Sequence, residues 1–358
     1  ATRPGWASSM VPRRASRKPA LEIIRTTLHA GGKFGQKNYS VSGGLHGVGS
    51  SVVNALAEEL EVTVMREGQI YSQTYARGLP TSKLKKGGGT RKRGTSVHFR
   101  PDPQIFGAKL SFDPKVVEER LETKAYLHGG LTIFFRDEAT RTEREICHPH
   151  GISDFLPKLV AQRGKPPTHP GHFALSVERA GEIKLELAMA WTEATEPHVR
   201  SYVNGIPTPM GGTHELGLLS AVTKAVRNFI DTKKAIPKTE KLSAEDIREG
   251  LCGLLSVYVH SPQFQGQTKD KLNNPEVSGA VEGVVRPALE QWLLENGSIG
   301  EAIVLRALLA ARAREARREA TQQVLRKTAV SHRLNLPGKL ADCASTDPAE
   351  SELFLVEG

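Results

Sequence analysis

The segment VSGGLHGVGSSVVNAL, residues 41–56, places four glycines within seven positions and then continues as a helix-like run. Glycine has no side chain, so its backbone amides stay uncovered, and the adjoining helix N-terminus adds free N–H groups and partial positive charge. Such a turn is suited to a polyphosphate. The segment matches neither GxxxxGK[ST] nor GxGxxG after a strand, so neither a P-loop nor a dinucleotide-binding fold is supported. Taken alone, it is also compatible with a purely structural turn.

The charge of the chain points to anionic partners. Its 358 residues are enough for about two domains with their own cores, and the formal net charge is +10. The basic residues concentrate in KLKKGGGTRKR (83–93) and RAREARREATQQVLRK (312–327). An excess of Lys and Arg attracts polyanions such as DNA or nucleotides. The alternative is a solvated loop and a solvated helix face.

Cysteine usage and hydropathy indicate a cytoplasmic protein without a membrane partner. Cys147, Cys252 and Cys343 lie far apart and lack metal-ligand spacing, which is typical of a reducing compartment. The chain has no run of about 18 or more apolar residues that could cross a membrane. Its N-terminal segment lacks the apolar core of a secretory signal.

Periodicity in the first part of the chain predicts an α+β unit that closes near residue 150. Residues 20–30 have helical spacing and stop at Gly31–Gly32. A second helix is predicted from Ser50 to Leu60, with three side chains facing the core: Val52, Val53 and Leu56. Alternation on both sides of Glu67–Gly68 predicts a hairpin. Further strands are predicted at GTSVHFRPD (94–102), LTIFFRDE (131–138) and EREICHP (143–149), with a helix at 114–124.

A second α+β unit is predicted after residue 150, because strands and helices again mix in sequence. Its strands are FALSVERA (173–180), KLELAMAWT (184–192) and RSYVNGIPT (200–208). Helices follow at 214–233, 275–295 and 300–327, and the segment 244–262 lies between the first two. From about Leu336 the pattern changes to loop residues and then to an apolar strand, LFLVEG, which predicts the start of a third domain.

Several blocks together resemble one family. The stretch LHAGGKFGQKNYSVSGGLHGVGSSVVNAL (28–56) closely resembles the ATP-lid region of the B subunits of bacterial type IIA topoisomerases, DNA gyrase and topoisomerase IV, which are GHKL ATPases. The blocks RGTSVHF, SYVNGIPTPMGGTH, LSVYVHSPQFQGQTKDKL, LPGKLADC and ELFLVEG follow in the family's order. The resemblance covers roughly residues 20–358, and independent blocks at consistent separations make it specific.

The resemblance implies a division of this α+β chain into four parts. Residues 1–19 are unmatched. Residues 20–150 would form part of a GHKL (Bergerat) ATPase domain, an α/β sandwich. Residues 151–328 would form a transducer domain with a ribosomal-protein-like α+β fold, and residues 329–358 the truncated start of a TOPRIM domain.

The resemblance also implies a site for ATP and Mg²⁺. Lys33 would supply a point charge near the phosphates, and Tyr39 would meet the base or sugar. Thr95 resembles the family's threonine that helps to hold adenine, and Arg66 is a weaker candidate beside the pocket. Backbone amides would wrap the triphosphate along the glycine-rich turn, which comprises Gly43, Gly44, Leu45, His46, Gly47, Val48 and Gly49.

Two further sites are implied at a distance from the glycine-rich turn. In the family, the loop with Gln267 and Lys269 reaches back to the γ-phosphate as part of the catalytic machinery. Such a lysine gains electrostatic energy only while the terminal phosphate is present, so that hydrolysis would release the second domain. Glu357 stands in the place of a TOPRIM acidic residue that takes part in Mg²⁺-assisted DNA cleavage and religation. A carboxylate at a strand end suits Mg²⁺, but one carboxylate does not complete that site.

The N-terminal segment departs from the family's pattern. The GHKL fold needs an early helix with a Glu general base and an Mg²⁺-binding Asn, followed by an Asp-x-Gly-x-Gly turn that recognises adenine. ATRPGWASSMVPRRASRK occupies the place of that turn and matches none of it. We expect residues 1–18 to be poorly ordered or arbitrary, as in a misread frame of a GC-rich gene. An uninterrupted frame found by DNA sequencing would contradict this.

The expected function is that of a B-subunit fragment with little or no ATP hydrolysis of its own. In the intact family member, ATP binding dimerises the B subunits around a double-stranded DNA segment, and the partner A subunit attacks the phosphodiester. SYVNGIPTPMGGTH, RGTSVHFRPD and LRKTAVSHRLNLPGKLADC look slightly closer to topoisomerase IV than to gyrase.

Two alternatives remain open at this point. Another GHKL protein, such as a mismatch-repair ATPase, chaperone or histidine kinase, would share the glycine-rich turn but lack LPGKLADC and ELFLVEG. A non-catalytic DNA-binding module is suggested by the net charge of +10 and by residues 312–327. Salt-dependent DNA binding without nucleotide binding would favour that module.

Overall fold

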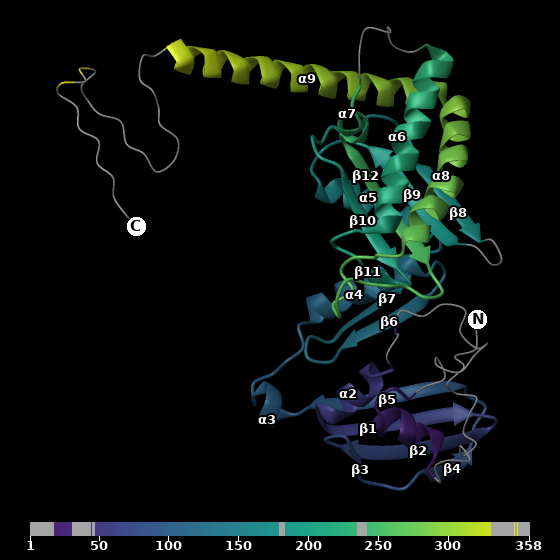
Figure 1. Ribbon diagram of the computed structural model, residues 1–358. Coiled ribbons are helices and arrows are strands. Elements are labelled where there is room, and N and C mark those ends of the chain that lie inside the picture. Colours follow the sequence, from purple (N-terminus) through teal and green to yellow (C-terminus); the bar gives the residue numbers. More distant parts are fainter. Residues whose placement is uncertain are drawn as a thin grey trace.

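Two β-sheets, each packed against helices, organise the part of the chain that the computed structural model describes (Figure 1). That part comprises residues 18–30, 44, 47–178, 183–234, 242–330, 347 and 349, and for residues 323–330 it comprises the backbone alone. The sheets follow one another along the chain, with helices before and after their strands. The predicted α+β class is therefore confirmed.

The first sheet has the strand order β3-β2-β1-β5, and β4 pairs with the opposite end of β2 from β3. All its pairings are antiparallel. Part of the predicted basic loop 83–93 forms strand β4, because its backbone pairs with β2. The strands are β1 (Ala57–Arg66), β2 (Gln69–Ala76), β3 (Leu79–Pro80), β4 (Lys85–Gly89) and β5 (Gly94–Pro101).

The turn between β1 and β2 confirms the predicted hairpin. Arg66 pairs with Gln69, and the two residues between them, Glu67 and Gly68, have φ of 53° and 75°. Two consecutive left-handed residues form the kind of tight turn whose twist matches that of antiparallel strands. The Glu-Gly dipeptide therefore sets the register of this hairpin.

Helices α1 (Ala20–Thr26) and α2 (Gly49–Ala55) pack against each other and over one face of the first sheet. Leu21 of α1 joins the core that Leu60 and Val62 of β1 form. The buried side chain of Asn54 on α2 donates a hydrogen bond to the carbonyl of Arg25, 3.0 Å away. This bond fixes the ends of the two helices relative to one another.

Both helices are shorter than the sequence pattern predicts. The backbone of Thr27 is extended, with φ −121° and ψ 130°, so α1 ends four residues before the predicted end at Ala30. The β-branched pair Thr26–Thr27 favours this change to extended backbone. α2 ends at Ala55, and β1 begins at Ala57, so the prediction of a helix to Leu60 was wrong.

The predicted core face of α2 was also wrong. The side chains of Val52, Val53 and Leu56 are 41%, 38% and 37% exposed, respectively. α2 instead turns Ser51 and Asn54 inward, where Asn54 donates to the carbonyl of Arg25 on α1 and Ser51 donates to the carbonyl of Val48, the N-cap residue of α2 itself. The bond from Asn54 to α1 therefore helps to orient this short helix.

The connection to the second sheet consists of α3 (Pro103–Phe106), α4 (Pro114–Leu127) and a separate hairpin of β6 (Thr132–Asp137) and β7 (Thr142–Cys147). The C-terminal turn of α4 packs in the second unit, where Tyr126 and Leu127 share a core with Phe155. Lys124 donates to the carbonyl of Gly205. Contacts therefore cross residue 150, and the domain boundary there stays a prediction.

The second sheet has the order β11-β10-β12-β9-β8 and confirms the predicted strands. β10 and β12 are parallel, and α6 (Thr213–Lys233) and α7 (Ala244–Arg248) lie between them in sequence. The other pairings are antiparallel. The strands are β8 (Phe173–Glu178), β9 (Lys184–Trp191), β10 (His198–Val203), β11 (Ile206–Pro207) and β12 (Leu251–Tyr258).

Helices cover both faces of the second sheet. On one face, α6, α8 (Pro275–Glu295) and the start of α9 (Gly297–Val330) enclose a core with Leu187 and Met189 of β9. On the other face, α5 (Ile152–Gln162) packs against Ala188 and Ala190. Alternate residues of one strand thus enter two different cores.

Helix α9 begins against the second sheet and then extends away from it (Figure 1). Arg306 donates to Glu249 at 2.7 Å, and Arg314 donates two hydrogen bonds of 3.0 Å to Asp246. Beyond these contacts, residues 312–320 are exposed, as expected for a solvated basic helix. None of the helices in the described ranges, α9 included, has the length and apolarity to cross a membrane.

Candidate functional site

The end of the glycine-rich turn has the geometry of a bare backbone loop before a helix. Gly47 has a left-handed φ of 60°, and Val48 is the N-cap residue of α2. Among the described residues, no side chain caps this end of the helix, and Gly49 leaves open space where a Cβ would stand. The amides of the first turn of α2 therefore have no cap from the described part of the chain. Gly44 is the other described residue of this turn.

Thr95 lies on the helix-covered face of the first sheet. It is directly opposite Val64, and residues opposite each other in an antiparallel pair share a face. Val64 belongs to the core that Leu21 of α1 closes. The exposed Thr95 side chain therefore projects from the same side of the sheet as α1 and α2.

Arg66 lies at the end of β1, two residues after Val64, and so projects from the same face. Its guanidinium forms an ion pair of 2.9 Å with the exposed carboxylate of Glu67. The positive charge of Arg66 is thus partly neutralised within its own hairpin. A role for Arg66 beside the nucleotide pocket stays a prediction.

Gln267 and Lys269 lie in a preformed hairpin within residues 259–274, which we call the Lys269 arm. The amide of Gln265 donates to the carbonyl of Lys271 at 2.9 Å, and Asn273 donates to Gln263 at 2.8 Å. Phe264 and Leu272 form an antiparallel bridge between these bonds. Gln267 and Lys269 therefore lie at the tip of a paired structure.

The backbone of Lys269 is unusual for a residue with a side chain. Its φ is 63°, in the left-handed region that costs such residues free energy. Non-glycine residues in that region occur mainly at turns and functional sites, where the surroundings hold them in place. The described backbone thus presents Lys269 in one defined geometry.

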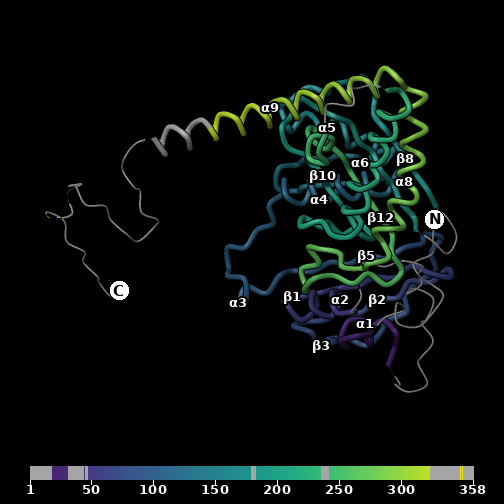
Figure 2. The backbone as a smooth tube through the Cα atoms, turned by 45° about the horizontal axis from the view of Figure 1, so that its top comes forward, coloured from purple at the N-terminus to yellow at the C-terminus, as the bar shows by residue number. Residues whose placement is uncertain are grey.

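The Lys269 arm lies at the end of the second unit that faces the first sheet. Both Figure 1 and Figure 2 show its green trace there, between the second sheet and the strands β1 and β5. The arm is thus on the side of the molecule from which it would have to reach the glycine-rich turn. That Lys269 and the glycine-rich turn bind the same triphosphate stays a prediction.

A buried polar cluster supports the arm from the start of α6. The Oγ of Ser201 and the Oγ1 of Thr208 are 2.8 Å apart, and Thr208 also hydrogen-bonds the Nε2 of His214 at 3.1 Å. Burial lowers the pKa of His214 to about 4 and raises the pKa of Glu215. His214 is therefore neutral near pH 7, and the cluster acts as a scaffold rather than as a charged site.

Six of the residues predicted for the site lie outside the described residues: Lys33, Tyr39, Gly43, Leu45, His46 and Glu357. Within the described ranges, no group of three or more His, Cys, Asp and Glu side chains could hold a metal ion. The predicted sites for the base and for Mg²⁺ therefore remain expectations.

Two features around the arm were not singled out from the sequence. Gly212, quoted only within a family block, approaches Leu272 so closely that an added Cβ would lie 2.3 Å from the Leu272 carbonyl oxygen. Asn274 is buried at the root of the arm, at the end of its second strand, and its side chain bonds to Ser261 and Gln263 of the first strand. The NGIPTPMGGTH block contains Gly212 and could have drawn attention to it. Asn274 stands before a proline at a helix start, and in sequence it resembles an ordinary helix cap.

Comparisons with known proteins agree on one family. The DNA gyrase B profile matches residues 151–323. The gyrase B protein of Staphylococcus epidermidis is 41% identical over 344 residues, which cover 95% of this chain and 53% of the relative. The Streptococcus pneumoniae protein is 42% identical over 348 residues, covering 95% of this chain and 52% of the relative. The chain thus spans about half the length of these curated relatives.

Solved structures give the same result for the fold. The 43K ATPase domain of Thermus thermophilus gyrase B, in complex with an aminocoumarin, has a TM-score of 0.72 and 33% identity, covering 88% of this chain and 80% of that one. The topoisomerase IV ATP-binding domain of Francisella tularensis has a TM-score of 0.70 and 30% identity. The match covers 85% of this chain and 80% of that one.

The two α+β units, with a glycine-rich turn in the first and a lysine-bearing arm in the second, have the architecture of the ATPase regions of type II topoisomerases. Within that class, the chain belongs to the DNA gyrase B family, the B subunits of bacterial type IIA topoisomerases. The resemblance noted from the sequence is confirmed, and the mismatch-repair, chaperone and histidine kinase alternatives are not supported.

Proposed function

We propose that this chain is the ATP-binding part of a type II topoisomerase B subunit, in which nucleotide binding couples the first α+β unit to the second. The observation that carries the proposal is the Lys269 arm, a hairpin of the second unit on the side of the first sheet (Figure 2). An ammonium group on a rigid arm can join the units only while a terminal phosphate is present.

The described residues fit a polyphosphate. Gly47 and the uncapped end of α2 offer backbone amides, and Thr95 offers a hydroxyl on the same face of the sheet. Lys33, Tyr39, Gly43, Gly44, Leu45, His46, Val48 and Gly49 complete the proposed pocket, and Gln267 and Lys269 close it over the γ-phosphate. Within the described residues, no group of three or more His, Cys, Asp and Glu side chains could hold a metal ion, and the magnesium ligand proposed is Glu357.

The proposed activity of the whole protein is ATP-dependent passage of double-stranded DNA through a double-strand break. Its proposed partners are the topoisomerase A subunit, a second copy of the B subunit and DNA, in the cytoplasm. Some sequence blocks look slightly closer to topoisomerase IV, whereas the family profile and the curated relatives compared above are gyrase B. Negative supercoiling of relaxed circular DNA with the A subunit would assign gyrase, and decatenation alone would assign topoisomerase IV.

The first experiment measures equilibrium binding of a non-hydrolysable ATP analogue and of ADP to the purified chain. Lys269→Ala should weaken binding of the triphosphate analogue by about tenfold or more, because a hydrogen bond to a charged phosphate oxygen is lost, and should leave ADP binding unchanged. Lys271→Ala, on the same arm but away from the tip, is the matched control. Equal losses for both nucleotides, or no nucleotide binding at all, would contradict the proposal.

The second experiment measures ATP turnover by residues 1–358. We expect little or none, since the general-base Glu and the Mg²⁺-binding Asn of the family pattern are missing from this sequence. Robust turnover would refute that expectation.

A DNA-binding module without nucleotide chemistry is the second candidate, because residues 312–320 on α9 are exposed and rich in arginine. Salt-dependent DNA binding by a chain that fails to bind nucleotide would favour it.

A further inference from the structure

The root of the Lys269 arm is joined by one buried side chain. Asn274 is 2% exposed, and its Oδ1 accepts a hydrogen bond of 2.6 Å from the amide of Gln263. Its Nδ2 donates to the carbonyl of Ser261 at 3.2 Å and to the Oε1 of Glu276 at 2.8 Å. The amide group thus links the strand that leaves β12 to the first turn of α8.

Asn274 occupies the N-cap position of α8 but does not cap that helix. An asparagine at this position ordinarily accepts a hydrogen bond from an amide of the first helical turn. Here no side-chain cap bond is present, and the carbonyl oxygen of the side chain points to the arm instead. Two of its three side-chain bonds therefore go to the arm, and the third goes to the side chain of Glu276 rather than to a backbone amide of the helix.

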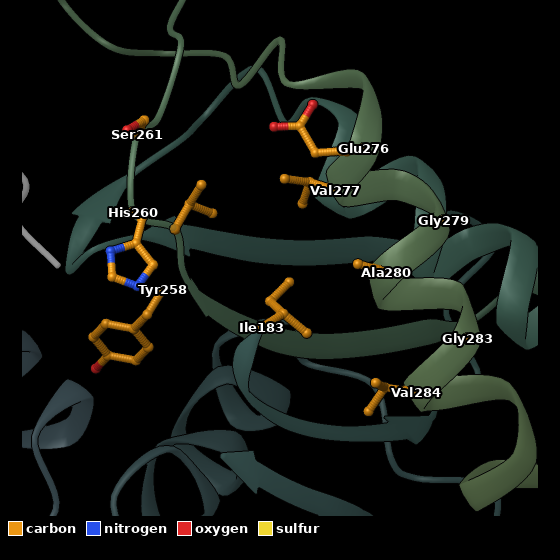
Figure 3. A pocket seen from close by; sticks show the side chains of 11 residues that line it. Ile183, Tyr258, His260, Ser261, Glu276, Val277, Gly279, Ala280, Gly283 and Val284 are labelled. Atoms are coloured by element: carbon orange, nitrogen blue, oxygen red, sulfur yellow. The ribbon is translucent and has the colours of Figure 1, made fainter. Parts of the chain in front are cut away.

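The root of the arm borders a cavity on the side of α8. A cavity of about 550 Å³ lies between residues 258–261 and the helix (Figure 3). On the helix side, Gly279, Ala280 and Gly283 provide almost no side chain, and a Cβ added at either glycine would meet nothing within 4 Å. Buried Val277 and partly buried Val259 still pack in the core beside this cavity, and the hydrogen bonds of Asn274 add to that packing.

The arm is also tied along its side to the start of α6. Leu272, which is 0% exposed, donates to the carbonyl of Gly211 and accepts from the amide of Thr213, each at 3.1 Å. Met210 donates to the carbonyl of Asp270 at 3.0 Å. A displacement of the arm at Leu272 would break these bonds, so the arm and the start of α6 move together.

From these contacts we propose that Asn274 is a positioning residue for Lys269. Its side-chain amide holds the two strands of the arm together at their root, so that Lys269 at the tip is presented as part of one body with α6 and α8. The role that this gives to Lys269 rests on the proposed function, whereas the clamping of the arm does not.

The first test measures amide hydrogen exchange in the full chain with Asn274→Ala. We expect exchange in residues 263–273 to accelerate by about tenfold or more, because the root bonds are lost, while the first turns of α8 keep their protection. Asn273→Ala is the matched control, since that neighbouring side chain is exposed. Unchanged exchange in the arm, or an equal loss of protection in α8, would overturn the inference.

The second test is a double-mutant cycle on nucleotide discrimination. Asn274→Ala should lower the ratio of affinities for a non-hydrolysable ATP analogue and ADP by about tenfold, and should have no further effect on a Lys269→Ala background. An equal effect on both backgrounds would show that Asn274 does not act through Lys269. If the wild-type chain does not discriminate between the nucleotides, the proposed function fails, and hydrogen exchange alone decides whether Asn274 clamps the arm.

Discussion

His214 lies on the first turn of α6 with none of its side chain exposed, and its Nε2 is 3.1 Å from the Oγ1 of Thr208. Burial removes the imidazole from water and lowers its pKa from 6.5 to about 4. The ring is therefore neutral in the folded chain at pH values at which an unfolded chain would already protonate it.

This difference predicts a loss of stability in mild acid. Below about pH 6.5 the unfolded state binds a proton that the folded state does not take up until about pH 4, so the free energy of unfolding falls across that window, by up to about 3 kcal/mol. His214→Gln should reduce the pH dependence of the urea midpoint between pH 7.5 and pH 4.5. His98→Gln, at an exposed position on β5, should leave it unchanged. Equal slopes for wild type and His214→Gln would show that another group is responsible.

At the scale of elements, the short helix α7 connects α9 to the second sheet. Asp246 and Ser243 form a capping box, in which each side chain bonds to the backbone of the other residue. The same carboxylate accepts both hydrogen bonds from Arg314 of α9. One buried carboxylate thus caps the start of α7 and fixes the direction of α9.

Asp246→Ala should therefore lower the free energy of unfolding by about 2 kcal/mol, since it removes a cap and a bidentate partner. Asp246→Asn keeps an oxygen acceptor and should cost about half as much. Arg286→Ala removes an exposed pair with Glu290 at the surface of α8 and should change stability much less than either Asp246 variant. Urea denaturation of the three variants checks this order, and similar losses for Asp246→Ala and Arg286→Ala would contradict it.

The sequence predicts helices, strands and turns correctly where neighbouring residues determine them. It does not predict those features that depend on contacts with residues far away in the chain. The turn at Glu67–Gly68 needs only two left-handed residues, and alternation fixes the strands beside it. The face that α2 turns inward depends instead on the bond from Asn54 to the carbonyl of Arg25, 29 residues earlier, and hydrophobic periodicity does not contain that contact. Apolar Val52 was therefore assigned to the core and found exposed.

The residues of the candidate site also differ in how far the sequence predicts their roles. The bare turn at Gly47 follows from glycine spacing, and Lys269 was found through the family resemblance, since a lysine in a loop is usually only surface. The role of Asn274 depends on a hydrogen bond to the amide of Gln263, 11 residues earlier, and no local pattern distinguishes it from a helix cap.

At the scale of the whole molecule, the helices cover the first sheet unevenly. Val97 and Phe99 of β5 lie opposite Val62 and Leu60, on the face that α1 and α2 cover over β1. Yet Val97 is 42% and Phe99 is 40% exposed in the described structure. Phe99 meets Phe112 edge-on with ring centroids 6.1 Å apart, and Phe112 is itself 59% exposed.

Adjacent exposed apolar side chains of this kind attract apolar dyes and other apolar surfaces. We expect the purified chain to increase the fluorescence of anilinonaphthalene sulfonate under native conditions, and Val97→Thr with Phe99→Thr to reduce the increase by about twofold or more. Threonine suits a strand, so the double variant should keep its circular dichroism. Leu79→Thr is the control, because Leu79 is 71% exposed on β3, at the opposite edge of the sheet from β5. Equal fluorescence from wild type and the double variant would show that the dye binds elsewhere and that β5 is covered in solution.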